Sequence, residues 1–141
     1  MIDTKQIRES VATICQKYGE EYWRNLDKKK EYPTDFVKEM TTSGFLNILI
    51  PQEYGGAGLG LKEACVVLEE LSLQGAHAGA CHAQMYVMGT LLRHGSDKQK
   101  KEYLPKISSG DIMPYRRFHG TEYRIRSRQS TNTCYFERRR I

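Results

Sequence analysis

A glycine-dense turn in the first half of the chain constrains the fold more than any other feature of the sequence. It reads Pro-Gln-Glu-Tyr-Gly-Gly-Ala-Gly-Leu at residues 51–59 and separates the apolar run 45–50 from a long helical pattern. Glycines at this density let the backbone take positive φ or approach another surface closely, so we expect a turn of defined shape. Phosphate binding fits the spacing poorly, because Glu63 stands three residues after Gly60, where a dinucleotide fingerprint needs glycine. No Gly-Lys-Ser/Thr follows either, so we interpret the turn as a surface connection between two elements.

The residues before the turn show helical periodicity. An amphipathic helix is predicted from apolar residues at three- and four-residue steps, namely Ile7, Val11, Ile14, Tyr18 and Tyr22. Asp3 is placed to cap this helix. A charged connector at 27–31 then precedes a second helix, which we expect to begin near Pro33 and to end at Gly44.

Three further helical segments are predicted after the turn. The first carries an apolar face formed by Leu61, Cys65, Leu68 and Leu71. A small-residue hinge at 75–80 leads to a second helix with Met85, Met88, Leu91 and Leu92. Ser96 and Gln99 form a capping box that starts the last helix, which Pro105 is expected to bend. The sequence therefore predicts an all-α fold, an antiparallel bundle of four to five helices with an irregular C-terminal tail.

Composition excludes several classes of protein. The 141 residues, 39% of them hydrophobic, suit one globular domain. No apolar run approaches the roughly 20 residues that cross a bilayer, and the N-terminus lacks an export signal, so we expect a cytoplasmic protein. The cysteines at 15, 65, 81 and 134 form no C-x-x-C pair, which predicts reduced thiols and no metal site. Cys81 and His82 are adjacent and should point about 100° apart on a helix, so we interpret them as packing residues.

The charge is concentrated at the C-terminal end of the chain. Residues 1–110 hold 14 basic and 14 acidic side chains, whereas residues 111–141 hold 8 basic and 3 acidic ones. This segment therefore accounts for the whole net charge of +5, and all of its basic residues are arginines. The change in composition indicates a boundary between two parts of the chain.

Four motifs, read in order, resemble the acyl-CoA dehydrogenase family. They are Gly-Phe at 44–45, Ile-Pro-Gln-Glu-Tyr-Gly-Gly-Ala-Gly-Leu at 50–59, Leu-Glu-Glu-Leu at 68–71 and Gly-Ser-Asp-Lys-Gln-Lys-Lys-Glu-Tyr-Leu-Pro at 95–105. The resemblance covers most of residues 1–110, and we interpret residues 1–111 as the N-terminal helical domain of such an enzyme. It also implies that the helix after Gly75 lies near the acyl-chain pocket. The candidates for lining that pocket are Gly79, His82, Ala83 and Tyr86, although ordinary packing is an alternative role for them.

The resemblance implies an FAD-dependent desaturation of a fatty acyl-CoA between its α and β carbons. In the family, a carboxylate of the C-terminal helical domain removes the α proton, and FAD, held mainly by the middle β domain and a partner subunit, accepts the β hydride. Neither domain is found in this sequence, so we assign no catalytic, cofactor-binding or metal-ligating residue and expect the fragment to be inactive and free of FAD. The implied partners of the parent enzyme are acyl-CoA, electron-transfer flavoprotein and further copies of itself, without a membrane or a specific nucleic acid.

The family pattern stops at about Asp111. Relatives continue into a β-rich stretch with Thr-Glu-Pro-x-x-Gly-Ser-Asp, but here Thr121-Glu122 is followed by Tyr123. Shifting the possible codons of residues 119–127 by one base permits Thr-Glu-Pro-Asn-Thr-Gly-Ser-Asp. We therefore interpret residues 112–141 as an out-of-frame or disordered tail. Sequencing the gene tests this, because the shifted frame must continue as a dehydrogenase β domain.

Two other functions remain open from the sequence. The interleaved arginines and aromatic residues of 112–141 resemble a nucleic-acid-binding arm, yet they show no period and no known module. A helical module that binds an acyl chain without flavin is the second alternative. If the chain is instead a fragment of a dehydrogenase, its apolar helix faces lack their neighbouring domains, which predicts exposed hydrophobic patches and a tendency to associate.

Overall fold

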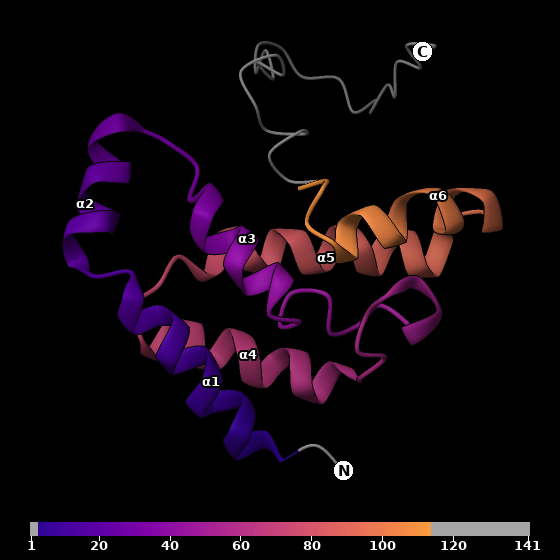
Figure 1. Cartoon of the computed structure of the whole chain (residues 1–141), viewed down its shortest axis with the longest axis horizontal. Coiled ribbons are helices and arrows are strands. Elements are labelled where there is room, and N and C mark those ends of the chain that lie inside the picture. The colour runs from indigo at the N-terminus through magenta and orange to yellow at the C-terminus, as the bar shows by residue number, and fades with distance from the viewer. Residues whose placement is uncertain (1–2, 114–141) are drawn as a thin grey trace, which may run out of the picture.

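The computed structural model describes residues 3–113, and every regular element in that range is helical (Figure 1). In chain order the elements are α1 (Thr4–Lys17), α2 (Glu20–Lys29), α3 (Thr34–Thr42), a 3₁₀ turn η1 (Gln52–Tyr54), α4 (Leu61–Leu73), α5 (Ala78–His94) and α6 (Asp97–Ser108). The all-α prediction is confirmed, with six α-helices among the described residues rather than four or five. From residue 114 onward, the arginine-rich segment predicted to be an irregular tail lies outside the described residues.

The additional helix arises from a break in the first periodic segment. α1 begins after the predicted cap, where Asp3 Oδ1 accepts a hydrogen bond from the Lys5 amide, and ends at Lys17, with Tyr18 as its C-cap. Gly19 is extended and starts α2, and the Trp23 indole donates to the Tyr18 carbonyl across the break at 2.9 Å. α2 continues to Lys29, so the predicted connector at 27–31 is mostly helical. Its basic last turn is typical of a helix C-terminus, where positive charge stabilises the helix dipole.

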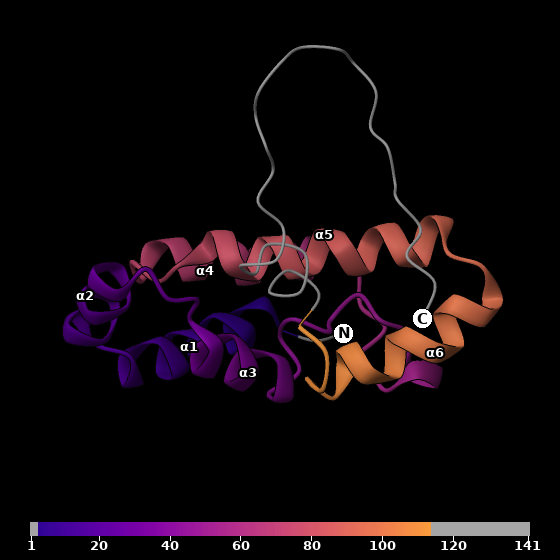
Figure 2. The same cartoon turned by 90° about the horizontal axis from the view of Figure 1, so that it is seen from above.

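The helices pack in two layers (Figure 2). α4 and α5 run antiparallel in one layer, and α1, α3 and α6 form the other. The larger core cluster draws on α1, α3, α4 and the start of α5, and a smaller one joins the second half of α5 to α6. α5 is 17 residues long and contributes Met85 to the first cluster and Met88 to the second, as its periodicity predicted. The capping box of Ser96 and Gln99 at the start of α6 is also confirmed.

The buried face of α4 differs from the predicted one. Ala64, Val67 and Leu71 face the core, whereas Leu61 is 74% exposed and Cys65 is exposed. Of the predicted face only Leu71 is fully buried, and the prediction was therefore wrong for this helix. The reason is that α4 carries apolar residues around most of its circumference, so helical periodicity alone does not identify the side that packs on α1.

An aromatic cluster joins α1, α2 and α3. The ring centroid of Phe36 lies 5.1 Å from that of Tyr18 and 5.0 Å from that of Trp23, and both pairs meet edge to face. Tyr22 contacts both Tyr18 and Trp23 in the same geometry. Phe36 is completely buried, so this cluster anchors α3 against the bend between α1 and α2.

Beside this cluster, the Glu39 carboxylate receives two hydrogen bonds from α1 and the residue after it. Lys17 Nζ lies 2.6 Å from Glu39 Oε1, and the Tyr18 hydroxyl donates to Glu39 Oε2 at 2.6 Å. The Lys17 hydrogen bond, followed by that of Tyr18, lowers the pKa of Glu39 below its ordinary value of 4.5. Burial and the Glu39 carboxylate raise the pKa of Tyr18. The ionised carboxylate thus holds α3 against the end of α1.

This arrangement predicts a pH dependence of stability. The pKa of Glu39 is lower in the folded than in the unfolded chain. Ionised Glu39 therefore adds to the free energy of unfolding above the unfolded pKa of 4.5, and this stabilisation is lost as the pH falls below that value. Glu39→Gln should therefore reduce the difference between the urea midpoints measured at about pH 7 and about pH 3.5. Glu20→Gln, which alters an exposed carboxylate on α2, is the control. An unchanged difference in Glu39→Gln would contradict the prediction.

Candidate functional site

An open groove on the α4–α5 layer is the best candidate for a ligand site. Its volume is about 660 Å³. Its apolar walls are Leu49, Leu59, Leu61, Tyr86 and Leu92. Gly89 and Thr90 lie between these walls, and Arg93 and His94 stand at the end of α5. The groove can therefore hold an elongated apolar group whose polar or anionic end lies near Arg93.

The path of the glycine turn brings Leu59 to this groove. The Gly58 amide donates to the Ile50 carbonyl and the Leu59 amide to the Ile48 carbonyl, both at 2.8 Å. These two hydrogen bonds fold the turn back on the segment that precedes it. Gly55 and Gly58 have φ values of 83° and 64°, the left-handed region that favours glycine. The predicted turn of defined shape is confirmed.

A buried polar contact fixes the other side of the turn to the end of α6. The Ser108 hydroxyl donates to the Gly55 carbonyl at 2.5 Å. Asn47 Nδ2 donates to the same hydroxyl at 3.0 Å and to the Ser108 carbonyl at 3.1 Å. Because Asn47 and Ser108 are both buried, the turn is held to the layer opposite α4 and α5.

The N-terminus of α4 is already occupied by a carboxylate from its own chain. Glu63 Oε2 accepts a hydrogen bond from the Gly60 amide at 3.1 Å. A bound phosphate would need amides at this position, and the Glu63 charge would repel it. The structure therefore supports the interpretation of the glycine segment as a connection and not as a phosphate cradle.

Of the four predicted pocket residues, three reach the outer surface of α5. Gly79, His82 and Tyr86 are exposed, whereas Ala83 is only 4% exposed and packs inward. The His82 and Tyr86 rings lie side by side, with centroids 5.7 Å apart. Tyr86 lines the groove, and the groove does not extend to Gly79, His82 or Ala83.

Sequence reasoning missed most of the groove. Leu61 was predicted to face the core, and Leu49, Leu59 and Leu92 were not identified as surface residues. The glycine turn carried a signal for Leu59, since a tightly folded loop ahead of a helix presents its last residues beside that helix. No local pattern distinguished Leu61 from a core leucine.

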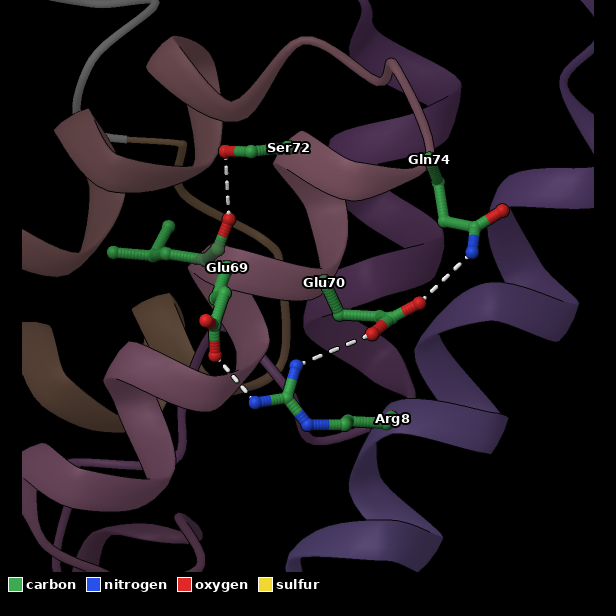
Figure 3. A network of polar contacts seen from close by, with 6 residues as sticks. Arg8, Glu69, Glu70, Ser72 and Gln74 are labelled. Carbon is green, nitrogen blue, oxygen red and sulfur yellow. Dashed lines mark hydrogen bonds and ion pairs between the residues drawn. The ribbon is translucent and has the colours of Figure 1, made fainter.

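A charged network joins α1 to α4 near the groove layer (Figure 3). The Arg8 guanidinium pairs with Glu69, and its Nη1 lies 3.3 Å from Glu70 Oε2. The side chain of Glu70 is only 10% exposed, and its other oxygen accepts a hydrogen bond from Gln74 Nε2 at 2.8 Å. Both carboxylates raise the pKa of Arg8, above all through the hydrogen bond from Arg8 to Glu69. The network orients α4 on α1 and contains two acidic groups for one basic group.

Two of the three cysteine thiols in the part of the chain that the structure describes are buried. Burial raises the pKa of the Cys15 thiol to about 11 and that of the Cys81 thiol to about 12, so both are protonated at neutral pH. Cys81 is buried and His82 exposed, which agrees with the predicted divergence of these neighbours. Among residues 3–113, no three His, Cys, Asp or Glu side chains gather in a geometry that could hold a metal ion. No described helix is both long and apolar enough to cross a membrane.

The fold and the groove define a helical domain with a glycine-rich turn and an open apolar face. The family model for "Acyl-CoA dehydrogenase, N-terminal domain" matches residues 2–111. The chain belongs to the acyl-CoA dehydrogenase family, as the sequence motifs predicted.

Relatives in bacteria, animals and plants show the same region of similarity. The chain is 32% identical over 111 residues to acyl-CoA dehydrogenase FadE12 of Mycobacterium tuberculosis, covering 78% of this chain and 29% of the relative. It is 34% identical over 121 residues to mitochondrial isovaleryl-CoA dehydrogenase of Bos taurus, covering 79% and 27%. It is 38% identical over 111 residues to mitochondrial 2-methylacyl-CoA dehydrogenase of Solanum tuberosum, covering 76% and 27%. The match thus spans between a quarter and a third of these relatives' length.

Proposed function

We propose that this chain is the N-terminal helical fragment of an FAD-dependent acyl-CoA dehydrogenase that desaturates a fatty acyl-CoA in its complete form. The match of residues 2–111 to the N-terminal domain of the family, at between a quarter and a third of the relatives' length, is the observation that carries the proposal. We place the domain at residues 1–111 and treat 112–141 as a separate segment. The cytoplasmic location stays a prediction, since two of the relatives are mitochondrial by name.

In this proposal, the outer surface of α5 forms one wall of the acyl-chain pocket. Tyr86 supports it most directly, because it is 48% exposed and lines the apolar groove. Gly79 and His82 extend the same surface toward the start of α5, and Ala83 lies beneath it. The side chains of His82 and Tyr86 would limit the depth available to the acyl chain. Arg93 and His94 provide polar groups at the opposite end of the groove.

FAD would supply the hydride acceptor of the complete enzyme. Among residues 3–113 we assign no flavin-binding site. The amides of the glycine turn donate hydrogen bonds to the backbone of the turn and of the segment before it, and the Gly60 amide donates to the Glu63 carboxylate. The role of this fragment is therefore to bind and orient the acyl chain. In this proposal, only the complete family protein catalyses the desaturation, passes electrons to electron-transfer flavoprotein and forms the oligomer.

The purified 141-residue chain should show no flavin absorption band and no desaturation of acyl-CoA. Titration calorimetry with a series of saturated acyl-CoA thioesters should nevertheless detect binding that strengthens as the acyl chain lengthens. Tyr86→Asp should weaken this binding at least about tenfold, because it places a charge in the apolar wall. Tyr103→Asp is the matched control, since Tyr103 is 40% exposed on α6 and does not line the groove.

Two outcomes would contradict parts of this proposal. Bound FAD with dehydrogenase activity would show that the chain is not an inactive fragment. Acyl-CoA binding without flavin also fits the alternative of a helical acyl-binding module, which differs in needing no further domain. A failure to bind any acyl-CoA, or equal effects of the two tyrosine substitutions, would contradict the assignment of the groove.

A further inference from the structure

A second cleft, separate from the acyl groove, lies between α2 and the link that joins α4 to α5 (Figure 1, Figure 2). Its volume is about 510 Å³, and it shares no lining residue with the groove. One buried and three half-buried residues form its apolar base, namely Pro33, Trp23, Leu26 and Ala76. Four exposed ionisable residues line its rim, namely Asp27, Lys30, Glu31 and His77. This cleft, which we call the α2 cleft, therefore suits a small ligand with an apolar part and charged groups.

The charged side chains of the rim form no ion pairs with the rest of residues 3–113. Asp27, Lys30 and Glu31 lie within five residues at the C-terminal end of α2, so two carboxylates and one ammonium stand close together. The two carboxylates can accept hydrogen bonds from an ammonium group of a ligand, which the negative end of the α2 dipole also attracts. The rim thus offers partners for both signs of charge, with an excess of negative charge.

His77 adds a hydrogen-bond donor on the opposite side of the cleft. Its Nδ1 accepts a hydrogen bond from the Ala80 amide at 3.1 Å and so caps α5. A ring nitrogen that accepts a hydrogen bond carries no proton, so the neutral ring holds its proton on Nε2. No acceptor among residues 3–113 binds this Nε2–H. His77 and the Lys30 ammonium are therefore two donors that can bind a carboxylate.

Lys30 has a backbone conformation that glycine adopts more easily. Its φ of 53° is the one positive value of a non-glycine residue among residues 3–113. At this C-cap, the Lys30 amide donates to the Asp27 carbonyl at 3.1 Å, and the Glu31 amide donates to the Leu26 carbonyl at 3.0 Å. Glycine is the usual residue in this arrangement, and two lysines in the last turn of α2 already balance the helix dipole. The end of α2 does not need the Lys30 side chain, which is thus available to a ligand in the cleft.

We propose that the α2 cleft binds the zwitterion of an α-amino acid with an apolar side chain. The ammonium group of the ligand contacts Asp27 and Glu31, and its carboxylate contacts Lys30 and His77 Nε2–H. Because Trp23 lies one helical turn before Asp27, about 6 Å along the axis, a side chain of a few atoms reaches from the rim to the indole. The indole N–H already donates to a backbone carbonyl, so the ring provides apolar contact.

The fluorescence of Trp23 tests the binding, because it is the one tryptophan of the 141-residue chain. The complete chain is titrated with phenylalanine, with phenylethylamine, which lacks the carboxylate, and with phenylpropanoate, which lacks the ammonium group. Phenylalanine should change the emission saturably, with a dissociation constant at least about fivefold below that of either analogue. The acyl groove shares no residue with this cleft, so failure of one site leaves the other standing.

Substitutions at the rim test which side chain binds which group. Asp27→Asn combined with Glu31→Gln should weaken the binding of phenylalanine and phenylethylamine but not that of phenylpropanoate. Lys30→Gly should weaken the binding of phenylalanine and phenylpropanoate but not that of phenylethylamine. It should also raise the urea midpoint, because glycine suits the positive φ, so the loss of binding cannot result from unfolding. Glu21→Gln and Lys28→Gln remove the same charges from exposed positions of α2 outside the cleft and should leave all three constants unchanged.

The opposite results are equally clear. An emission of Trp23 that does not change with phenylalanine would overturn the proposal. Equal binding of the three ligands would also overturn it, because an apolar base alone would then explain the affinity. So would rim substitutions that weaken all three ligands alike, since they would act on the shape of the cleft and not on the charged groups of the ligand.

Discussion

Phe36→Ala should destabilise the folded chain by about 3 to 5 kcal/mol. Phe36 has no exposed surface and meets the rings of Tyr18 and Trp23 edge to face. The substitution removes these contacts and leaves a cavity where α1, α2 and α3 meet, because three helices cannot all close around it. A small domain is stable by only about 5 to 15 kcal/mol, so the loss is a large fraction of the total.

Urea unfolding, followed through the fluorescence of Trp23 and through helical circular dichroism, measures this effect. Both signals should move together to a lower urea midpoint if the domain unfolds in one step. Leu73→Ala is the control, since it also removes a large apolar side chain but at a position that is 70% exposed, and its effect should stay within about 0.5 kcal/mol. A loss in Phe36→Ala no larger than that in Leu73→Ala would contradict the burial of this ring.

The features of the fold that could be predicted are those that depend on neighbours in sequence. Asp3 caps α1 and Ser96 caps α6 because a side-chain oxygen reaches amides two or three residues ahead, which the sequence alone displays. The break at Gly19 was not predicted, since Tyr18 and Tyr22 continue the apolar period across it. That period persists because both tyrosines join the aromatic cluster from opposite sides of the break.

The orientation of α4 and the groove depend on contacts that are distant in sequence. Arg8 on α1 binds Glu69 and Glu70, and this fixes which side of α4, a helix with apolar residues around most of its circumference, faces inward. Leu61 consequently points outward, where it joins Tyr86 in the groove. Tyr86 could be identified from the family resemblance, but its partners in the groove required the three-dimensional path of the glycine turn.

The glycine turn should tolerate substitution least at Gly56. A Cβ atom there would lie 2.1 Å from the Ile50 carbonyl oxygen and 2.4 Å from the Ile50 Cβ. The Ile50 carbonyl cannot move away freely, because it accepts the 2.8 Å hydrogen bond from the Gly58 amide that closes the turn. Gly56→Ala should therefore cost about 3 kcal/mol or more, through overpacking and loss of this hydrogen bond. The urea midpoint measures the cost.

Gly89→Ala is the matched control for this substitution. It adds the same methyl group in the middle of α5, where a Cβ atom would meet nothing within 4 Å, and it should stabilise the domain by about 0.5 to 1 kcal/mol because alanine favours the helix. The opposite signs of the two changes separate a steric requirement of the turn from any general effect of replacing glycine. If Gly56→Ala were neutral, the close approach of the turn to Ile50 would be disproved. The path that carries Leu59 to the groove would then need another explanation.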